Sequence, residues 1–357
     1  MLRRPPRCMD AGGDPATPRT GGTLGTWRRV QMADDVQARR EGVLAALAAH
    51  PGERVSGGAL ARELGCSRAA VHRHVEALRA AGIPIAATRA GYVLDPAADP
   101  VVPSAVIPLL APPLAGPVTW TPEIGSTNDE AAALARGGAP EGTVIGSDHQ
   151  TAGRGRRGRA WLDAPGEALM FTVILRPRVG PVGAGMLPIV VALGLADGLE
   201  ACGVAGVEIA WPNDVLAGGT KVAGILCEMS ADQERVAWAV AGMGINVGPV
   251  PDVPGSRWTP GSLAALGTRP RRGDLLVAVL GAIGRRYEAW LEHGPDGVVA
   301  AFGRRDHLAG RHVTVGTPAG DVIGMGCGID ALGRLVVAVD GQEVALSSGE
   351  VTGVDRG

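Results

Sequence analysis

Lysine and asparagine are nearly absent from this sequence of 357 residues. Of its 34 lysine and arginine residues only Lys221 is a lysine, and its asparagines are Asn128, Asn213 and Asn246. A composition biased this strongly towards arginine removes any lysine or asparagine that a substitute could replace. Arginine cannot stand in for a compact ammonium group in a tight site, and asparagine offers a hydrogen-bond donor and an acceptor together. These four residues are therefore candidates for functional positions.

Cysteine usage and net charge exclude several classes of protein. The five cysteines are scattered, odd in number and without a Cys-x-x-Cys pair. This spacing indicates neither a disulfide framework nor a zinc site, and it is typical of a reduced cytoplasmic protein. The formal net charge is −2, so any binding of nucleic acid must be confined to a local basic surface.

Targeting and membrane segments are not predicted either. Residues 1–34 are rich in proline, glycine and arginine, and we expect them to be disordered because they have no apolar period. The segment has no h-region, so it is not predicted to be a secretory signal. The uncharged run 101–122 carries many prolines and reads as a linker. The uncharged run 179–196 is interrupted by glycines and prolines, so we predict a buried helix that starts near Pro188 rather than a membrane span.

Residues 35–96 have the pattern of a winged helix-turn-helix domain. A short amphipathic helix ends at a turn, Ser67 is a good N-cap, and a second helix with a buried apolar stripe runs to Gly82. Residues 83–94 form the predicted hairpin wing. The candidate DNA contacts are polar and basic residues off the stripe or in the wing: Ser67, Arg68, His72, Arg73, Arg79 and Arg89. The alternative is a helical hairpin with a solvated basic face.

Two further domains follow a linker at residues 97–116. Residues 117–306 alternate predicted strands and helices, which indicates a mixed sheet covered by helices. The predicted helices are 128–136, 188–201 and 272–292. Residues 307–357 change to short strands with tight turns, and we predict a small β-barrel there. The predicted fold class is α+β.

Residues 153–161, the arginine loop, interleave four arginines with three glycines. Such a loop is expected to be mobile when empty and to be ordered by an anion that several guanidinium groups and backbone N–H groups can bind. The glycines match Gly-x-Gly-x-x-Gly, but a turn and a strand follow them instead of a helix that could hold a pyrophosphate. A solvated basic loop or a nucleic-acid patch is the alternative.

Other short polar clusters lie in the same domain. Ser126, Thr127 and Asn128 precede a helix, and one of them is expected to cap it. A carboxylate and an amide at the end of a strand, as in Trp211-Pro-Asn-Asp214, suit a magnesium ion or a phosphate-bound metal. Gly242 to Asn246 places glycines where backbone or ligand must come close. Each cluster also has a plain interpretation as a cap, a turn or a strand end.

Together, the arginine loop, Ser126-Thr-Asn128, Trp211-Pro-Asn-Asp214, Lys221-Val-Ala-Gly-Ile-Leu-Cys-Glu228 and Gly242-Met-Gly-Ile-Asn246 resemble the signature set of biotin protein ligases. Residues 65–82 resemble the DNA-binding domain of the bifunctional bacterial form. The resemblance covers about residues 36–357 and implies a catalytic domain like that of class II synthetases and an SH3-like C-terminal barrel.

The resemblance implies a reaction in two steps. ATP and biotin would give biotinyl-AMP and pyrophosphate, and the biotinyl group would then pass to one lysine of a carboxyl carrier domain of acetyl-CoA carboxylase. Lys221 would bridge the biotin carboxylate and the α-phosphate as charge develops. By position, the biotin site comprises Ser126, Thr127, Asn128, Gln150, Arg154, Gly155, Arg156 and Lys221. The nucleotide site comprises Arg157, Arg159, Trp161, Asn213, Asp214 and Asn246.

The family further implies Mg²⁺ that arrives with ATP, with no metal held by the protein alone, and a homodimer when biotinyl-AMP is bound. It also implies repression of biotin genes through operator DNA. One departure is Ala210, which stands where the family usually has a basic residue, so phosphate binding on that side would be weaker unless Arg157 compensates. Two alternative functions stay open: lipoate attachment on a related scaffold, and a DNA-binding regulator without ligase activity.

Overall fold

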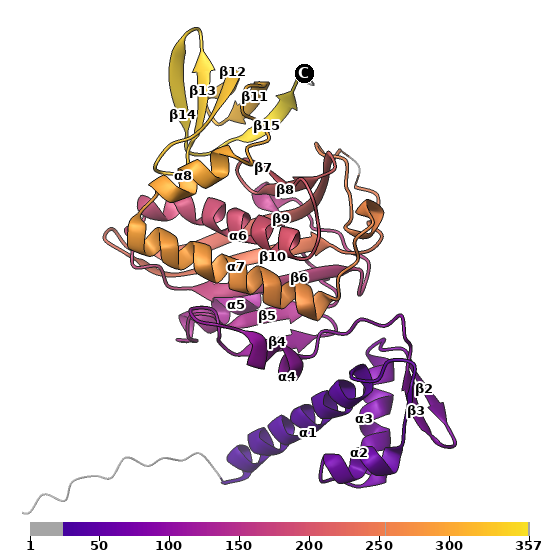
Figure 1. Ribbon diagram of the computed structural model, residues 1–357. Helices are drawn as coiled ribbons and strands as arrows, with labels where there is room; N and C mark the ends of the chain where they lie inside the picture. The colour runs from indigo at the N-terminus through magenta and orange to yellow at the C-terminus, as the bar shows by residue number, and fades with distance from the viewer. Residues whose placement is uncertain (1–23, 254, 356–357) are drawn as a thin grey trace, which may run out of the picture.

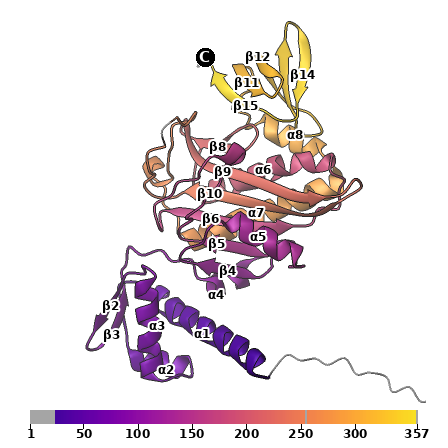
Figure 2. The same cartoon turned by 180° about the vertical axis from the view of Figure 1, so that it is seen from behind.

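The computed structural model describes residues 24–253 and 255–355, which form three parts along the chain (Figure 1). An N-terminal unit is followed by a central unit built on a seven-stranded sheet and by a C-terminal five-stranded sheet. In both views the N-terminal unit and the C-terminal sheet lie at opposite ends of the central unit (Figure 2). The predicted α+β fold in three parts is confirmed.

The N-terminal unit is a winged helix-turn-helix with a hydrophobic core of its own. Its elements are α1 (Leu24–Ala48), β1 (Arg54–Val55), α2 (Gly57–Glu63), α3 (Arg68–Ala80), β2 (Ile85–Thr88) and β3 (Gly91–Leu94). Ser67 caps α3 as predicted, because its hydroxyl oxygen accepts the backbone N–H of Ala70 at 3.1 Å. Helix α1 begins within segment 1–34, for which disorder is expected, and residues 1–23 lie outside the described residues.

The segment after the wing is partly buried in the central unit and is not only a linker. It contains α4 (Pro103–Val106) and a short 3-10 turn, η1 (Ile107–Leu109). Val101, Val106 and Leu114 are buried in the core of the central unit. The apolar residues between the prolines explain this packing, since their burial removes apolar surface from water.

The central sheet places helices on both of its faces. Its strands are β4 (Val118–Thr121), β5 (Val144–Ser147), β6 (Ala168–Leu175), β7 (Glu208–Ala210), β8 (Asp214–Ala217), β9 (Thr220–Ala231) and β10 (Val236–Asn246). Its helices are α5 (Thr127–Arg136), α6 (Leu187–Ala201), α7 (Arg272–His293) and α8 (Asp296–Gly303). The strand order is β4-β5-β6-β10-β9-β8-β7, with only β4 and β5 parallel. Helices α6 and α7 cover the face seen in Figure 1, and α5 covers the face seen in Figure 2.

Helix α6 is a core helix, as predicted for residues near Pro188. Together with the turn η3 (Gly183–Met186) it is the one segment of the described chain with the length and hydropathy of a membrane span, yet 72% of its most apolar stretch is buried inside the molecule. Gly194 and Gly198 let α7 approach closely. A Cβ at these glycines would lie 2.5 Å and 2.6 Å from the backbone of Ile283 and Val279.

The C-terminal sheet is antiparallel and shares a core with the central unit. Its strands are β11 (His312–Thr317), β12 (Gly320–Ile329), β13 (Leu335–Val339), β14 (Gln342–Leu346) and β15 (Glu350–Val354). The sequence predicts the first four strands but not β15. This last strand pairs with β11 and brings Glu350 and Val351 back to the central unit.

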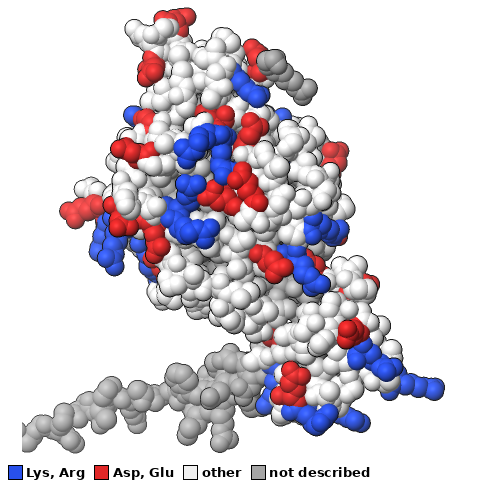
Figure 3. Space-filling model, viewed as in Figure 1, with Lys and Arg blue, Asp and Glu red and all other residues white. Residues whose placement is uncertain are grey.

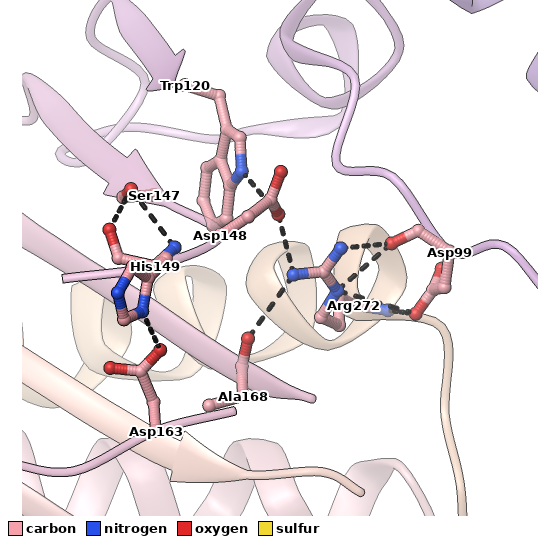
Figure 4. A network of polar contacts seen from close by, with 8 residues as sticks. All are labelled: Asp99, Trp120, Ser147, Asp148, His149, Asp163, Ala168 and Arg272. Atoms are coloured by element: carbon pink, nitrogen blue, oxygen red, sulfur yellow. Dashed lines mark hydrogen bonds and ion pairs between the residues drawn. The ribbon is translucent and has the colours of Figure 1, made fainter. Parts of the chain in front are cut away.

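A buried arginine fastens the segment after the wing to the central sheet (Figure 4). Arg272, the first residue of α7, is 4% exposed and donates to the backbone oxygen of Asp99, to the carboxylate of Asp148 at 2.7 Å and to the backbone oxygen of Ala168. The Asp99 carboxylate in turn accepts the backbone N–H of Arg272 at 2.8 Å. Trp120 donates to the same oxygen of Asp148. The guanidinium group therefore ties three segments of the chain together.

Replacing Arg272 should destabilise the central unit. In Arg272→Met the half-buried Asp148 carboxylate loses its cation, so we expect the free energy of unfolding to fall by about 3 kcal/mol, as measured by urea denaturation. Arg269→Met is the matched control, because the Arg269–Glu167 pair is exposed on the same stretch of chain and should contribute less than about 1 kcal/mol. Equal losses in the two variants would contradict the anchoring role of Arg272.

Candidate active site

A pocket of about 420 Å³ opens in the central unit beside the arginine loop. It is lined by the loop, the start of α5, the turn between β7 and β8, and the neighbouring strands β9 and β10. The predicted ligand residues that line it are Ser126, Thr127, Asn128, Gln150, Arg154, Gly155, Arg156, Arg159, Trp161, Asn213, Asp214, Lys221 and Asn246. Arg157 is the predicted ligand residue that does not line it. The fold thus gathers residues from several separate segments.

The polar end of the pocket is built around the first turn of α5. The side chain of the N-cap residue Ser126 makes no capping hydrogen bond, so the predicted local cap is wrong. Instead the Gln150 side-chain oxygen accepts from the backbone N–H of Thr127 at 2.8 Å and from its hydroxyl group at 3.1 Å. Gln150 lies close because the backbone N–H of Thr151, the next residue, donates to Ile124, just before the helix. The cap therefore comes from another segment of the chain.

Asn128 is fixed by three neighbours. Its amide nitrogen donates to the backbone oxygen of Leu226 and, at 2.8 Å, to the carboxylate of Glu228, and its oxygen accepts from the Thr172 hydroxyl at 2.7 Å. Gly242 makes room for it, since a Cβ there would lie 2.1 Å from the Asn128 side-chain oxygen. Donor and acceptor are thus both used, which explains why asparagine is kept. Thr172 carries no sequence signal, because it lies within an apolar strand.

The Trp161 ring packs against the glycines of β9 and β10. A Cβ on Gly244 would lie 2.4 Å from the indole ring, and one on Gly224 would lie 3.1 Å from it. These glycines therefore act by letting the ring approach the sheet. The indole Nε1 of Trp161 is buried and has no hydrogen-bond partner among the described residues.

Lys221, at the start of β9, forms an ion pair with a carboxylate of the neighbouring strand β8. Its Nζ lies 2.6 Å from Oδ1 of Asp214 and 5.9 Å from the centroid of the Trp161 ring. Asp214 is the first residue of β8, directly after the turn formed by Trp211-Pro-Asn213. The segment is a turn, and Asn213 and Asp214 at its end line the pocket. That they bind a ligand or a phosphate-bound metal stays a prediction.

The two remaining asparagines fasten backbone segments at the pocket wall. The Asn213 amide nitrogen donates to the backbone oxygen of Ile225 at 3.0 Å, and that of Asn246 donates to the backbone oxygen of Gly261 at 2.9 Å. These bonds fix the neighbouring walls. Whether the asparagines also contact a nucleotide stays a prediction.

Carboxylates of the chain hold most of the arginine loop. Arg154 pairs with Asp129 at 2.5 Å and with Glu228 at 3.2 Å. Arg157 and Arg159 both pair with Glu350 of β15. Protein anions therefore already pair with three of the four loop arginines. The expected mobility of the empty loop stays a prediction. Glu350 could not be found from the sequence, since it lies in the strand that was missed.

Arg156 differs from the other loop arginines. Its nearest polar partner is the Asn213 side-chain oxygen at 3.5 Å, and among residues 24–253 and 255–355 it has no carboxylate within ion-pair distance. Burial lowers the pKa of Arg156, and so does the nearby charge of Arg157. A half-buried cation in this situation favours the binding of an anion in the pocket.

A second arginine reaches the site from an unexpected segment. Arg257 donates to Oδ2 of Asp214 at 2.8 Å, and burial lowers its pKa to about 10, so it is still charged at neutral pH. Ala210 is fully buried in β7 and does not line the pocket. The expected compensation by Arg157 is not supported, because Arg157 points to Glu350. Within the described chain no group of three metal-ligating side chains occurs, and both oxygens of Asp214 are bound by cations.

Three family matches cover most of the chain. Residues 123–246 match the Biotin/lipoate A/B protein ligase family, residues 309–352 match the Biotin protein ligase C terminal domain, and residues 39–93 match an HTH domain. The Bifunctional ligase/repressor BirA of Bacillus subtilis is 33% identical over 290 residues, which is 80% of this chain and 89% of that protein. The chain belongs to the biotin protein ligase family.

Other similar proteins support the same family assignment. The Biotin--[acetyl-CoA-carboxylase] ligase of Mycobacterium tuberculosis is 36% identical over 64% of this chain and 86% of its own length. The structure of the biotin protein ligase from Aquifex aeolicus in complex with biotin and ATP aligns with a TM-score of 0.57 at 25% identity, and covers 67% of this chain and 99% of that one. The predicted family and its combination with a helix-turn-helix domain are confirmed.

The predicted DNA contacts lie apart from the pocket, on the N-terminal unit. Val71, His74, Val75 and Leu78 of α3 face the core. The predicted contact residues are all exposed: Ser67, Arg68, His72, Arg73, Arg79 and Arg89. Figure 3 shows basic side chains, which are all arginines in this unit, gathered at its outer end. The helix therefore presents its basic face to solvent, as a recognition helix must.

Enlarging Gly244 should release the arginine loop from the sheet. In Gly244→Ala the new Cβ meets the Trp161 ring, so the ring and the loop that carries it must shift. We expect trypsin to cleave the loop about tenfold faster, which corresponds to about 1.4 kcal/mol of lost local stability. Mass spectrometry of native digests measures this rate. Gly297→Ala is the control, since its Cβ would meet nothing within 4 Å, and unchanged cleavage in Gly244→Ala would refute the packing argument.

Proposed function

We propose that this protein is an ATP-dependent biotin ligase. It activates biotin to biotinyl-AMP with release of pyrophosphate and then transfers biotin to a lysine of the carrier domain of acetyl-CoA carboxylase. The observation that carries the proposal is the position of the chain's only lysine, which lines the same pocket as Arg156, a guanidinium group with no carboxylate partner among the described residues. The homologous ligases named above support the substrates biotin and ATP.

The first step joins two anions. An oxygen of the biotin carboxylate attacks the α-phosphorus of ATP, the bond to the β,γ-diphosphate breaks, and pyrophosphate leaves with its charge. The barrier includes the repulsion between carboxylate and phosphate, which fixed cations in a half-buried site reduce strongly. Lys221 and Arg156 line the same pocket and are suited to this role. Lys221 then acts by electrostatic stabilisation and transfers no proton.

The proposed ligand residues divide along the pocket. Those near α5 and the loop start would hold biotin: Ser126, Thr127, Asn128, Gln150, Arg154, Gly155 and Arg156, together with Lys221. The other lining residues would surround the nucleotide: Arg159, Trp161, Asn213, Asp214 and Asn246. Arg157 would join them only if ATP draws it away from Glu350. The arginine loop lines the pocket, and its closure over the adenylate would protect the mixed anhydride from water.

The second step needs no further protein charge. The carrier lysine, as a free amine, attacks the carbonyl carbon of biotinyl-AMP. An amide bond forms, the bond from the carbonyl carbon to the AMP oxygen breaks, AMP leaves, and the amine nitrogen loses one proton to solvent. Mg²⁺ would enter with the phosphates of ATP, because Asp214 is already bound by two cations and the described residues offer no resident metal site. The two substrates and the carboxylase partner favour a cytoplasmic location for the protein.

Lys221→Arg tests the ligase function directly. The charge is kept, but the planar guanidinium group cannot occupy the space of an ammonium group against Asp214. We expect pyrophosphate release with biotin, ATP and Mg²⁺ to fall at least about 100-fold, and streptavidin blotting of the carrier domain to show the same loss. Arg235→Lys, in the exposed turn between β9 and β10, is the control. Wild-type turnover in Lys221→Arg would rule out this role, and labelling with lipoate instead of biotin would favour the related lipoate reaction.

A second function is supported by the N-terminal unit. We infer that the protein also binds operator DNA as a biotin-dependent repressor, with its exposed basic residues on α3 and the wing at the phosphates and bases. The homologous bifunctional ligase/repressor proteins support this assignment. Biotinyl-AMP would act as corepressor and promote a homodimer, which would present two recognition helices.

Arg73→Ala tests the DNA interface. Loss of one phosphate contact should weaken binding across sequences and reduce the slope of log affinity against log salt by about 1. The probes are duplexes selected from a random library by the protein with biotin and ATP present, and the readout is fluorescence anisotropy. Arg235→Ala serves as control. Binding that ignores salt, or that needs neither biotin nor ATP, would argue against the repressor function.

A further inference from the structure

Asp214 is a buried carboxylate shared between two cations. Its side chain is 12% exposed, and its Oδ1 lies 2.6 Å from the Lys221 Nζ. Its Oδ2 accepts from the Arg257 Nη2 at 2.8 Å and from the Trp258 Nε1 at 3.1 Å. One oxygen therefore serves the lysine, and the other is satisfied by two donors from a separate segment.

Arg257 approaches this carboxylate from behind the pocket. Asp214 and Lys221 line the cavity, whereas Arg257 and Trp258 do not. The guanidinium group is 16% exposed and stacks on the Trp258 ring at 4.3 Å. Its Nη1 donates to the backbone oxygen of Val351 in β15. Trp258 itself packs edge-on against His307, with ring centroids 5.0 Å apart. The C-terminal sheet thus supports Arg257 on the side away from the ligand.

We propose that Arg257 is a positioning residue that keeps Asp214 paired when Lys221 turns from it to the reacting anions. This role rests on the ligase function proposed above. The single ammonium group of Lys221 pairs with different anions in two states. In the empty site it neutralises Asp214, and during activation it must neutralise the biotin carboxylate and the α-phosphate. A buried carboxylate that loses its cation is strongly destabilised. Arg257 and the Trp258 indole remain on Oδ2, so Lys221 can leave Oδ1 without that penalty.

Arginine suits this position better than lysine or a neutral residue. Its fork reaches Asp214 and Val351 at once, so the cation is fixed to the C-terminal sheet and cannot follow Lys221 into the pocket. The same bonds explain why Arg257 is tolerated beside Arg156 and Arg159, which are close enough to lower its pKa. Arg257 therefore connects β15 to Asp214 and, through this carboxylate, to Lys221.

The test is a double-mutant cycle on pyrophosphate release, with kcat and the KM values for biotin and ATP measured separately. In Arg257→Met we expect kcat to fall at least about tenfold, while KM for ATP changes by less than about threefold. Arg257→Lys restores a cation and should recover most of kcat. In an Asp214→Asn background no buried charge needs compensation, so adding Arg257→Met should cost less than about twofold. Arg235→Met, in the exposed turn, should leave kcat unchanged.

The outcomes separate the possible roles. The proposal is overturned if Arg257→Met is equally harmful in the wild-type and the Asp214→Asn backgrounds. It is also overturned if Arg257→Met raises KM for ATP with kcat unchanged, which would make Arg257 a direct nucleotide ligand. Thermal unfolding controls for folding, and Arg257→Gln, which keeps a donor for Val351, provides the same cycle if the methionine variant does not fold. Absence of pyrophosphate release by the wild-type protein would refute the proposed function itself.

Discussion

Cations that are removed from water need an anion, and this constraint organises the site. Lys221 and Arg257 meet it with the buried carboxylate of Asp214. Three of the four loop arginines are more exposed, and they pair with other carboxylates of the chain: Asp129, Glu228 and Glu350. Positive charge is therefore present at the pocket before any ligand arrives, because the Asp214 carboxylate offsets the desolvation of Lys221 and Arg257. A bound carboxylate or phosphate then competes with these protein anions. On binding, the ligand anion replaces a protein carboxylate as the partner of a cation. The cation is already close to the reacting atoms, so little rearrangement is needed there.

The glycines of β9 and β10 make this arrangement possible. Gly242 lets the Asn128 amide lie against the sheet, and Gly244 and Gly224 let the Trp161 ring do so. A strand with side chains at these positions would raise both groups away from the backbone and fill the cavity. The same central sheet carries α6 and α7 on its other face, where further glycines bring the helices close. Small residues therefore set the depth of the pocket on one face and the packing on the other.

Much of the fold and of the site follows from local patterns. Helical periods, caps and turn residues predict the helix-turn-helix, the long helices of the central unit and four strands of the C-terminal sheet. Scarcity of lysine and asparagine marks Lys221, Asn128, Asn213 and Asn246, and all four line one pocket. The misses have physical causes. The cap of α5 is supplied by Gln150 from a separate segment. Strand β15, Glu-Val-Thr-Gly-Val, contains a glycine and only two apolar residues, so its strand pattern is weak.

The sequence by itself determined which residue types are present for the chemistry: a compact ammonium, a loop of permanent cations, amides with a donor and an acceptor, and glycines between them. Only the tertiary structure decided which anion meets which cation. Glu350 binds an arginine that lies 191 residues away, and Arg257 reaches an aspartate 43 residues away. Such pairs leave no local pattern, because charge neutralisation depends on distances of a few ångströms in the folded chain and not on separation along it.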